Sequence, residues 1–258
     1  MQSNNQNNKL IYALDFDGVI CDSAIETAIT GWKAAQNIWQ DMPTSLPSNH
    51  LINDFRRVRP LLETGYEAII IIRLLYLKVR PESLLQNYPQ QIQTCIESNK
   101  LKVPQLKQLF GDIRDHWISQ APQQWLEMNP LFGGIKEQLA ILANSTWYII
   151  TTKQKRFVKQ ILQANKINIA DHCIYAMEAK MSKQETLIQL SKQHPKQNII
   201  FIEDRLLTLI NIQNNPQLKK IKLKLANWGY NTENDRKKAQ QHHIEIISQN
   251  QLISSLKS

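Results

Sequence analysis

The sequence predicts a protein of the α/β class, in which helices cover a parallel sheet and an all-helical segment is inserted after the first strand. Two observations support this prediction. From about residue 146 onward, apolar strand patterns alternate with helical patterns, which is typical of a parallel sheet. The apolar run at 10–14 has the character of those later strands, whereas residues 23–126 show only helical patterns.

The first half of the chain predicts one strand followed by helices. Residues 10–14 are apolar throughout, as expected for a strand that is buried on both faces. Ser23-Ala24-Ile25-Glu26 is a capping-box pattern, which predicts a helix from there to about Trp39. Further helices are expected at 48–57, 64–78, 88–99 and 104–119. The apolar run at 68–77 is too short to cross a membrane and is interrupted by Arg73, so we expect a buried helix there.

The second half predicts the rest of the sheet, after a helix at 135–142. The expected strands share short apolar runs: 146–150, 172–175, 198–202, 221–225 and 243–247. The expected helices lie between them: 154–165, 182–193, 205–213 and 232–240, with a last helix at the C-terminus. We therefore expect a disordered polar lead at 1–8, a core domain made of 9–22 and 127–258, and a helical domain at 23–126.

Composition limits the class of protein. The chain has 258 residues and a formal net charge of +9, and it contains no unbroken apolar stretch of membrane-spanning length. Its N-terminus lacks the basic and apolar regions of a signal peptide. Three scattered cysteines, Cys21, Cys95 and Cys173, are expected to be reduced thiols. These features favour a cytoplasmic protein with no membrane partner.

Part of the positive charge lies on one predicted strand near the C-terminus. Lys220, Lys222 and Lys224 alternate with apolar residues, which predicts one solvated lysine face. No basic helix and no stripe of interleaved aromatic residues accompanies these lysines. We therefore expect a solvated or edge strand here, and no nucleic-acid partner.

Acidic residues follow two of the predicted buried strands. Asp15 and Asp17 come directly after the strand at 10–14, and Glu203 and Asp204 come directly after the strand at 198–202. Burying an unpaired carboxylate costs on the order of several kcal/mol unless a nearby group offsets this cost. A divalent metal ion together with phosphate chemistry would offset it.

A hydroxyl and an amine follow two further strands. Thr151 lies between a strand and a helix start, where side-chain and backbone donors make an anion site. Lys183 lies in the first turn of the helix at 182–193, where the helix dipole disfavours a cation unless it binds a phosphate. Because ligands of an open parallel sheet bind beyond the carboxyl ends of its strands, we expect these four strand ends to form one site.

Taken in this order, the motifs resemble those of the haloacid dehalogenase superfamily, over nearly the whole chain. Asp15-Phe16-Asp17-Gly18-Val19 with Cys21-Asp22-Ser23 matches the first motif, and 130–135 resembles the segment that returns the chain from cap to core. Thr151, Lys183 and Glu203-Asp204 match the second, third and fourth motifs, with Lys180 as a competing candidate for the third. The helical insertion resembles the cap of the phosphoglycolate phosphatase and β-phosphoglucomutase branch.

The resemblance implies a Rossmann-like core with a helical cap domain and a role for each site residue. Asp15 would be the nucleophile that forms an aspartyl-phosphate, and Asp17 the general acid and then the base. Mg²⁺ would be bound by Asp15, Asp204 and the backbone carbonyl of Asp17, with Glu203 nearby. The transferring phosphoryl group would be held by Thr151, Thr152 and Lys183.

The acid at position 17 also separates the activities of this superfamily. A phosphomonoesterase needs an acid to protonate its leaving alkoxide, whereas a dehalogenase that releases chloride does not. The sequence therefore favours an Mg²⁺-dependent phosphatase that acts on a small phosphorylated metabolite. A phosphomutase and a catalytically silent ligand-binding or partner-binding member remain as alternatives.

Arginines in the helical insertion are the candidates for substrate selection: Arg56, Arg57, Arg59 and Arg73. One or two of them could recognise a carboxylate or a second phosphate on the substrate. Alternatively, they could form ion pairs with Asp54, Glu63 and Glu67 within the insertion.

Overall fold

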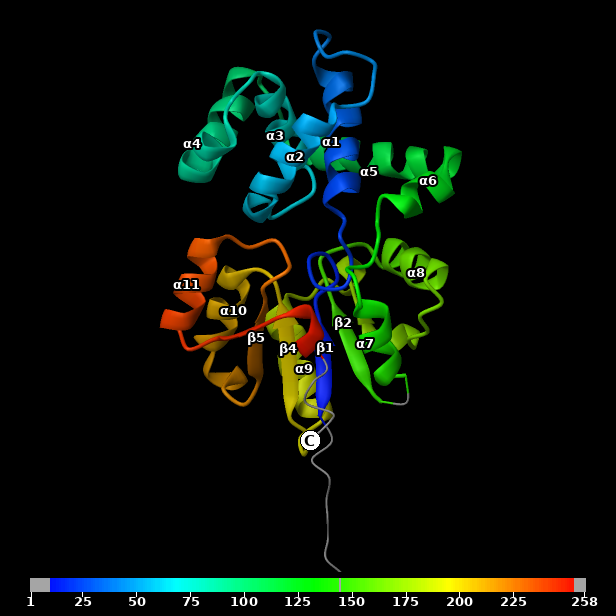
Figure 1. The fold of residues 1–258 in the computed structure, drawn as a ribbon, viewed down its shortest axis with the longest axis vertical. Coiled ribbons are helices and arrows are strands. Elements are labelled where there is room, and N and C mark those ends of the chain that lie inside the picture. Colours follow the sequence, from blue (N-terminus) through cyan, green and yellow to red (C-terminus); the bar gives the residue numbers. More distant parts are fainter. Residues whose placement is uncertain (1–9, 144, 253–258) are drawn as a thin grey trace, which may run out of the picture. The chain divides into compact units, whose positions relative to one another are not determined.

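The computed structural model, which describes residues 10–143 and 145–252, contains a six-stranded parallel sheet (Figure 1). The strands are β1 (Ile11–Leu14), β2 (Trp147–Ile150), β3 (Ile174–Tyr175), β4 (Ile199–Glu203), β5 (Lys222–Ala226) and β6 (Glu245–Ile247). Their order across the sheet is β3-β2-β1-β4-β5-β6, and every pairing is parallel. The predicted α/β class with a parallel sheet is confirmed.

The chain forms two compact units. One, the sheet unit, contains the part of the chain up to Asp22 and the part from Leu131 onward, and the other, the helical unit, contains Ser23–Pro130. The helices of the sheet unit are α7 (Ile135–Ile141), α8 (Lys155–Ala164), α9 (Lys183–Gln193), α10 (Leu206–Gln213) and α11 (Glu233–Gln241). The predicted polar lead at 1–8 lies outside the described residues, as does the chain from residue 253, where a last helix was expected.

Apolar side chains on both faces explain why β1 is central in the sheet. All four of its residues, Ile11–Leu14, are buried. Ile11 and Ala13 belong to an apolar cluster with Phe201 of β4 and with side chains of α9, α10 and α11. Successive side chains of a strand point to opposite faces, so the equally buried Tyr12 and Leu14 lie on the other face. A strand without a polar face has to be covered on both sides, which the helices do.

The strand order places the end of β1 at a topological switch point. From β1 the chain continues to β2 and β3 on one side, and from there it returns to β4 on the other side of β1. Open parallel sheets bind ligands at such points, because the loops on the two sides diverge there. The residues that follow β1, β2 and β4 therefore meet at one edge of the sheet.

The helical unit has its own core. Its helices are α1 (Ala24–Ile38), α2 (Asn49–Val58), α3 (Glu67–Tyr76), α4 (Pro81–Ser98), α5 (Val103–Gln120) and α6 (Pro122–Glu127). The predicted buried helix is present as α3, in which 69–72 are wholly buried isoleucines. Helix α4 begins at Pro81, earlier than predicted, because proline fits the first helical position, and it bends at Asn87.

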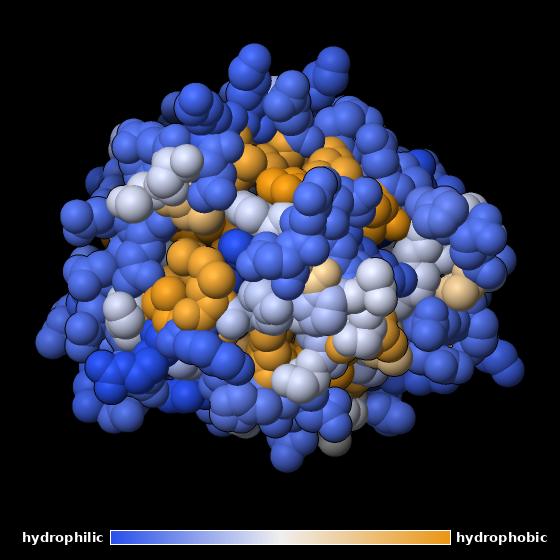
Figure 2. Space-filling view, turned by 90° about the horizontal axis from the view of Figure 1, so that it is seen from above, coloured by the Kyte–Doolittle hydropathy of each residue, from blue (hydrophilic) through white to orange (hydrophobic). Residues whose placement is uncertain are grey.

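The surface is mostly hydrophilic on the face that Figure 2 shows, with apolar patches between the polar side chains. Among the described residues of the helical unit, the large apolar side chains that are exposed are Leu46, Leu77 and Leu85. None of the described helices combines the length and the apolar character that a membrane span requires.

The capping box predicted at Ser23 does not form. The Ser23 side chain makes no cap hydrogen bond at the start of α1. Glu26 instead accepts hydrogen bonds from Arg114 Nε and Nη2, each at 2.8 Å, and from Thr30 Oγ1 at 2.8 Å and Trp125 Nε1 at 3.1 Å. A paired arginine stabilises a buried carboxylate more than a single backbone N–H does, so the tertiary ion pair replaces the local cap.

The prediction of a solvated lysine face on β5 is also only partly right. Lys222 is exposed, but Lys224 is buried, and its Nζ lies 2.9 Å from Glu245 Oε1 on β6. Strand β5 lies between β4 and β6, so it is not an edge strand. A carboxylate on the neighbouring strand, which the alternation of residues does not reveal, neutralises this lysine.

Replacing Glu26 with glutamine should destabilise the helical unit strongly. The change leaves Arg114, whose side chain is 13% exposed, without its carboxylate. Breaking a buried ion pair by removing one partner costs about 3–5 kcal/mol. Urea unfolding measures this loss, and Glu82→Gln is the matched control because it breaks the exposed Arg57–Glu82 pair. Exposed pairs contribute little, so the control should unfold like the wild type, and equal stability of all three proteins would contradict the prediction.

Candidate active site

Carboxylates from two adjacent strands meet at the switch point. Leu14 of β1 is paired with Ile202 of β4, so Asp15 and Glu203 follow at the same level of the sheet. The backbone N–H of Asp15 donates to Ile202 O at 2.9 Å, which continues the ladder to the end of β1. Asp15, Glu203 and Asp204 each offer a carboxylate oxygen, and these oxygens lie within 4.8 Å of one another. The structure therefore brings together the two acidic strand ends that the sequence singled out.

Lys183 lies between two of these carboxylates. Its Nζ is 2.9 Å from Asp15 Oδ1 and 2.6 Å from Glu203 Oε2. Ser182 and Glu185 form a capping box that begins α9 at Lys183. Burial by itself would lower the pKa of Lys183, but Asp15 and Glu203 raise it above its ordinary value, so the amine stays charged.

One lysine does not balance three acids. Burial, and then Glu203, raise the pKa of Asp15 from 3.8 to about 7, although Lys183 opposes the change. Burial, Glu203 and Asp15 raise the pKa of Asp204 well above its ordinary value. Burial would also raise the pKa of Glu203, but Lys183 outweighs it and holds that pKa below its ordinary value. Lys183 is thus shared between Glu203 and Asp15, so this cluster of three carboxylates contains a single lysine.

These donors fit a hard divalent cation. Carboxylate and carbonyl oxygens are the ligands that Mg²⁺ prefers, and a cation at Asp15 and Asp204 would oppose the burial and the negative charge of Glu203 that raise their pKa values. Asp15 and Asp204 are the residues of this cluster that could hold the ion. The Oε2 of Glu203 is bound by Lys183 Nζ.

Two glycines let the backbone approach Asp204. Gly18 has a φ of +91°, and a Cβ there would lie 2.0 Å from Asp204 Oδ2. A Cβ on Gly229 would lie 2.3 Å from Asp204 Cβ and 2.3 Å from the carbonyl oxygen of Gly18. Any side chain at either position would therefore displace the Asp204 carboxylate. Gly18 belongs to the first motif, whereas Gly229 lies in no motif of the sequence.

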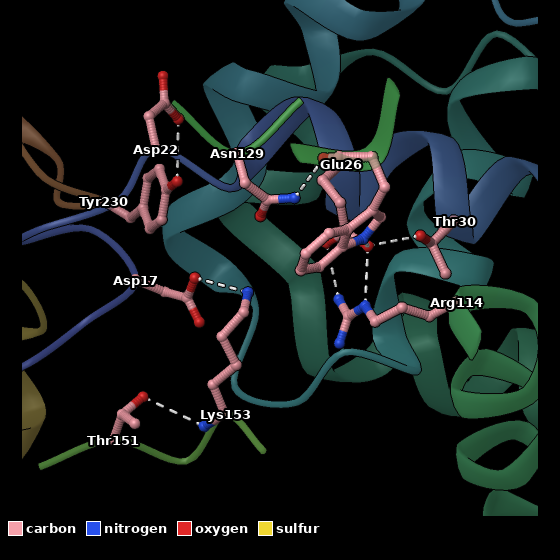
Figure 3. Close-up of polar contacts among 10 residues, drawn as sticks. Asp17, Asp22, Glu26, Thr30, Arg114, Asn129, Thr151, Lys153 and Tyr230 are labelled. Carbon is pink, nitrogen blue, oxygen red and sulfur yellow. Dashed lines mark hydrogen bonds and ion pairs between the residues drawn. The ribbon is translucent and has the colours of Figure 1, made fainter. Parts of the chain in front are cut away.

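Asp17 is held by a lysine that the sequence reasoning did not assign to the site. Lys153 Nζ lies 3.0 Å from Asp17 Oδ1, and the Lys153 side chain is only 3% exposed (Figure 3). The backbone N–H of Lys153 donates to Thr151 Oγ1 at 3.1 Å, so the loop after β2 curls around the threonine hydroxyl. Thr151 is buried, whereas Thr152 is exposed. The one sequence feature that indicates a site role for Lys153 is its position as the third residue after a buried strand.

The arrangement of sheet and insertion is shared with known structures. A haloacid dehalogenase-like family hydrolase from Streptococcus pneumoniae matches with a TM-score of 0.56 and 18% identity, over 96% of this chain and 99% of that chain. The chain has the haloacid dehalogenase-like fold. No sequence-family model matches the chain, and no curated protein sequence does either.

Two further proteins with the haloacid dehalogenase-like fold are similar over nearly their whole length. A predicted phosphoglycolate phosphatase from Haemophilus somnus has a TM-score of 0.57 at 14% identity, covering 97% of this chain and 99% of that chain. A haloacid dehalogenase family hydrolase from Deinococcus radiodurans, whose structure contains phosphate and sodium, has a TM-score of 0.55 at 9% identity. The match covers 96% of this chain and 95% of that chain.

Of the two lysines left open for the third motif of this fold, the structure places Lys183 beside Asp15. Lys180 is exposed and adopts a left-handed φ of +52° at the end of a short 3₁₀ helix. Asp15, Lys183, Glu203 and Asp204 therefore form one cluster of charged groups, and Asp17 forms an ion pair with Lys153.

Arg57 and Arg73, which were proposed for substrate selection, form ion pairs within the helical unit. Arg57 pairs with Asp54 at 3.4 Å and with Glu82, and Arg73 Nη1 lies 2.8 Å from Asp41 Oδ2. Arg73 also lies over the Trp39 ring, 5.1 Å from its centroid. Arg56 is exposed and Arg59 is half-buried. For Arg57 and Arg73 the geometry supports ion pairing, although only Asp54 was among the expected partners.

Proposed function

We propose that the protein is an Mg²⁺-dependent phosphomonoester hydrolase that acts on a small phosphorylated metabolite through an aspartyl-phosphate. The observation that carries this proposal is the convergence of Asp15, Lys183 and Asp204 at the switch point, with Asp17 two residues beyond Asp15. A phosphate is bound in the structure of the Deinococcus radiodurans protein, which has a similar fold, and this supports a phosphate-containing ligand for the present chain.

In the proposed first step, a carboxylate oxygen of Asp15 attacks phosphorus and the ester P–O bond breaks. Asp17 gives a proton to the departing alkoxide. In the second step Asp17 takes a proton from water, the water oxygen attacks phosphorus, and the acyl phosphate bond to Asp15 breaks, which releases phosphate. Phosphoryl transfer depends mainly on positioning and charge neutralisation, which Lys183 and the Thr151 hydroxyl would provide.

The metal would be held by Asp15, Asp204 and the backbone carbonyl of Asp17, with Thr152 contributing to phosphate binding beside Thr151. Mg²⁺, when bound, neutralises charge on the phosphoryl oxygens. Lys153 is a further candidate, because its ion pair with Asp17 fixes the carboxylate that would move protons. The helical unit would be the cap, and Arg56, Arg57, Arg59 and Arg73 remain the candidates there for reading a distal anion on the substrate.

Phosphate release from a panel of phosphorylated metabolites tests this function. Activity should disappear in EDTA and return with Mg²⁺, because Asp15 and Asp204 repel each other without a cation. Asp204→Asn should raise the Mg²⁺ concentration needed for half-maximal activity. Asp171→Asn is the matched control, since this exposed acid of the sheet unit pairs with Lys155 and Lys159 instead.

The outcome of the panel separates the alternatives. Full activity in thoroughly chelated protein contradicts the metal site. A phosphate transferred to a sugar product, in place of free phosphate, identifies a phosphomutase. No turnover of any phosphate ester, with intact ligand binding, identifies a catalytically silent member.

A further inference from the structure

The loop between β5 and α11 fixes one oxygen of Asp204. The backbone N–H of Tyr230 donates to Asp204 Oδ2 at 2.6 Å, and Asn231 Nδ2 donates to the Asp204 carbonyl at 3.1 Å. Gly229 packs directly against Asp204 Cβ. The Asp204 carboxylate therefore keeps its position only while this loop keeps its own.

The side chain of Tyr230 reaches the two segments that connect the sheet unit to the rest of the chain. Its hydroxyl donates to Asp22 Oδ1 at 2.9 Å, and Asp22 is the last residue before the helical unit (Figure 3). Its ring lies 6.4 Å from the ring of Phe132, which is the second residue after the helical unit. One side chain thus contacts both the outgoing and the returning connector.

The two connectors are also joined to each other. The N–H of Phe132 donates to Ile20 O at 3.1 Å, and Cys21 and Leu131 form an antiparallel bridge. Trp228, from the same loop as Tyr230, donates from Nε1 to Val19 O at 3.1 Å. The connectors and the β5–α11 loop therefore form one hydrogen-bonded structure within the sheet unit.

We propose that Tyr230 is a positioning residue that couples the order of the Asp204 carboxylate to the order of both connectors. The inference rests on the proposed function in one respect, namely that Asp204 holds the cation. The backbone of Tyr230 holds Asp204 and its side chain holds Asp22, so a movement of one residue disturbs both contacts. A cation that favours the ordered Asp204 must then suppress openings of the connectors, because a ligand stabilises the conformation that it binds.

Amide hydrogen exchange of the full chain, with Mg²⁺ and with EDTA, tests the coupling. At a hundredfold excess over its dissociation constant, a ligand suppresses openings that release it by about 100-fold. We expect Mg²⁺ to slow exchange at least about tenfold in peptides that cover 18–24 and 130–134. Tyr230→Phe should abolish this Mg²⁺-dependent protection at 22–24, where Asp22 accepts the Tyr230 hydroxyl, because Gly18 and Val19 contact Asp204 and Trp228 independently of that hydroxyl. Calorimetric Mg²⁺ affinity should stay within about threefold, because the backbone N–H to Asp204 remains.

Three further variants sharpen the test. Asp22→Ala should behave like Tyr230→Phe, whereas Asp22→Asn keeps an oxygen that can accept the hydroxyl and should retain the protection. Tyr148→Phe is the matched control, because it removes a tyrosine hydroxyl that lies 2.6 Å from His194 Nε2 in the same unit. This control should keep the protection in full.

The inference is overturned if Tyr230→Phe keeps the Mg²⁺-dependent protection, if Tyr148→Phe loses it too, or if the wild type shows none. Measuring phosphate release from the same wild type distinguishes a failure of the proposed function from a failure of the coupling. A wild type that releases no phosphate, but shows Mg²⁺-dependent protection that requires the Tyr230 hydroxyl, contradicts the phosphatase and supports the coupling. A wild type that releases phosphate without any such protection contradicts only the coupling.

Discussion

Asp15→Asn should reduce phosphate release at least about 10⁴-fold, in line with the effect of removing a catalytic nucleophile in other enzymes. The amide oxygen is a far weaker nucleophile than the carboxylate, and the change also removes a charge next to the position of the cation. Single-turnover assays with Mg²⁺ on the best substrate of the panel measure the loss. A variant with near wild-type turnover would remove Asp15 from the mechanism.

The stability of the same variant shows whether the loss is chemical. Burial and Glu203 raise the pKa of Asp15 from 3.8 to about 7 in the metal-free protein. The folded state then holds a proton that the unfolded state releases, so ionisation of Asp15 opposes folding increasingly from about pH 4, and fully above about pH 7. Asparagine has no such penalty. In EDTA at pH 8, Asp15→Asn should therefore unfold at the same temperature as the wild type or at a higher one.

Asp17→Asn should reduce the rate about 10²–10⁴-fold for an alkyl phosphate, the typical contribution of general acid–base catalysis. With para-nitrophenyl phosphate, the rate of aspartyl-phosphate formation should fall much less, because the nitrophenolate leaves without a proton. Asparagine retains an oxygen that can accept a hydrogen bond from Lys153 Nζ, now 3.0 Å from Asp17 Oδ1, so the local structure should persist. Burst kinetics separate formation of the intermediate from its hydrolysis.

Equal losses for alkyl and aryl substrates in the first step would contradict the assignment of Asp17 as the acid. Lys153→Met provides a comparison, because it removes the ion-pair partner and leaves the carboxylate. If Asp17 acts on the leaving group, Lys153→Met should not reproduce the difference between alkyl and aryl substrates that Asp17→Asn causes.

The β strands could be predicted from the sequence because their signal is local. Strand β1 is apolar at every position and ends in Asp15, and the strands after it alternate with helices. Backbone polar groups must pair, and a strand without a polar face must be covered on both sides, so these patterns leave few arrangements other than a parallel sheet. The positions of Asp15, Thr151 and Asp204 at strand ends follow from the same local information.

Side-chain partners depended on contacts that no local pattern encodes. Glu26 stands where a capping residue would stand, but Arg114, far along the chain, pairs with it. Lys153 pairs with Asp17 across 136 positions of the sequence, because β1 and β2 are neighbours in the sheet. Such pairs form when burial removes water from charged groups and the nearest opposite charge must replace it.

The sequence by itself determined that this chain builds a parallel sheet, interrupts it with helices and carries acids at the ends of two buried strands. The tertiary structure alone decided that Lys183 and not Lys180 meets Asp15, that Lys153 holds Asp17, and that Tyr230 joins Asp204 to Asp22. The physical reason is that apolar periodicity is a property of a single helix or strand. Charged side chains, in contrast, pair with those that lie on neighbouring strand ends, and the topology of the sheet decides which strand ends are neighbours.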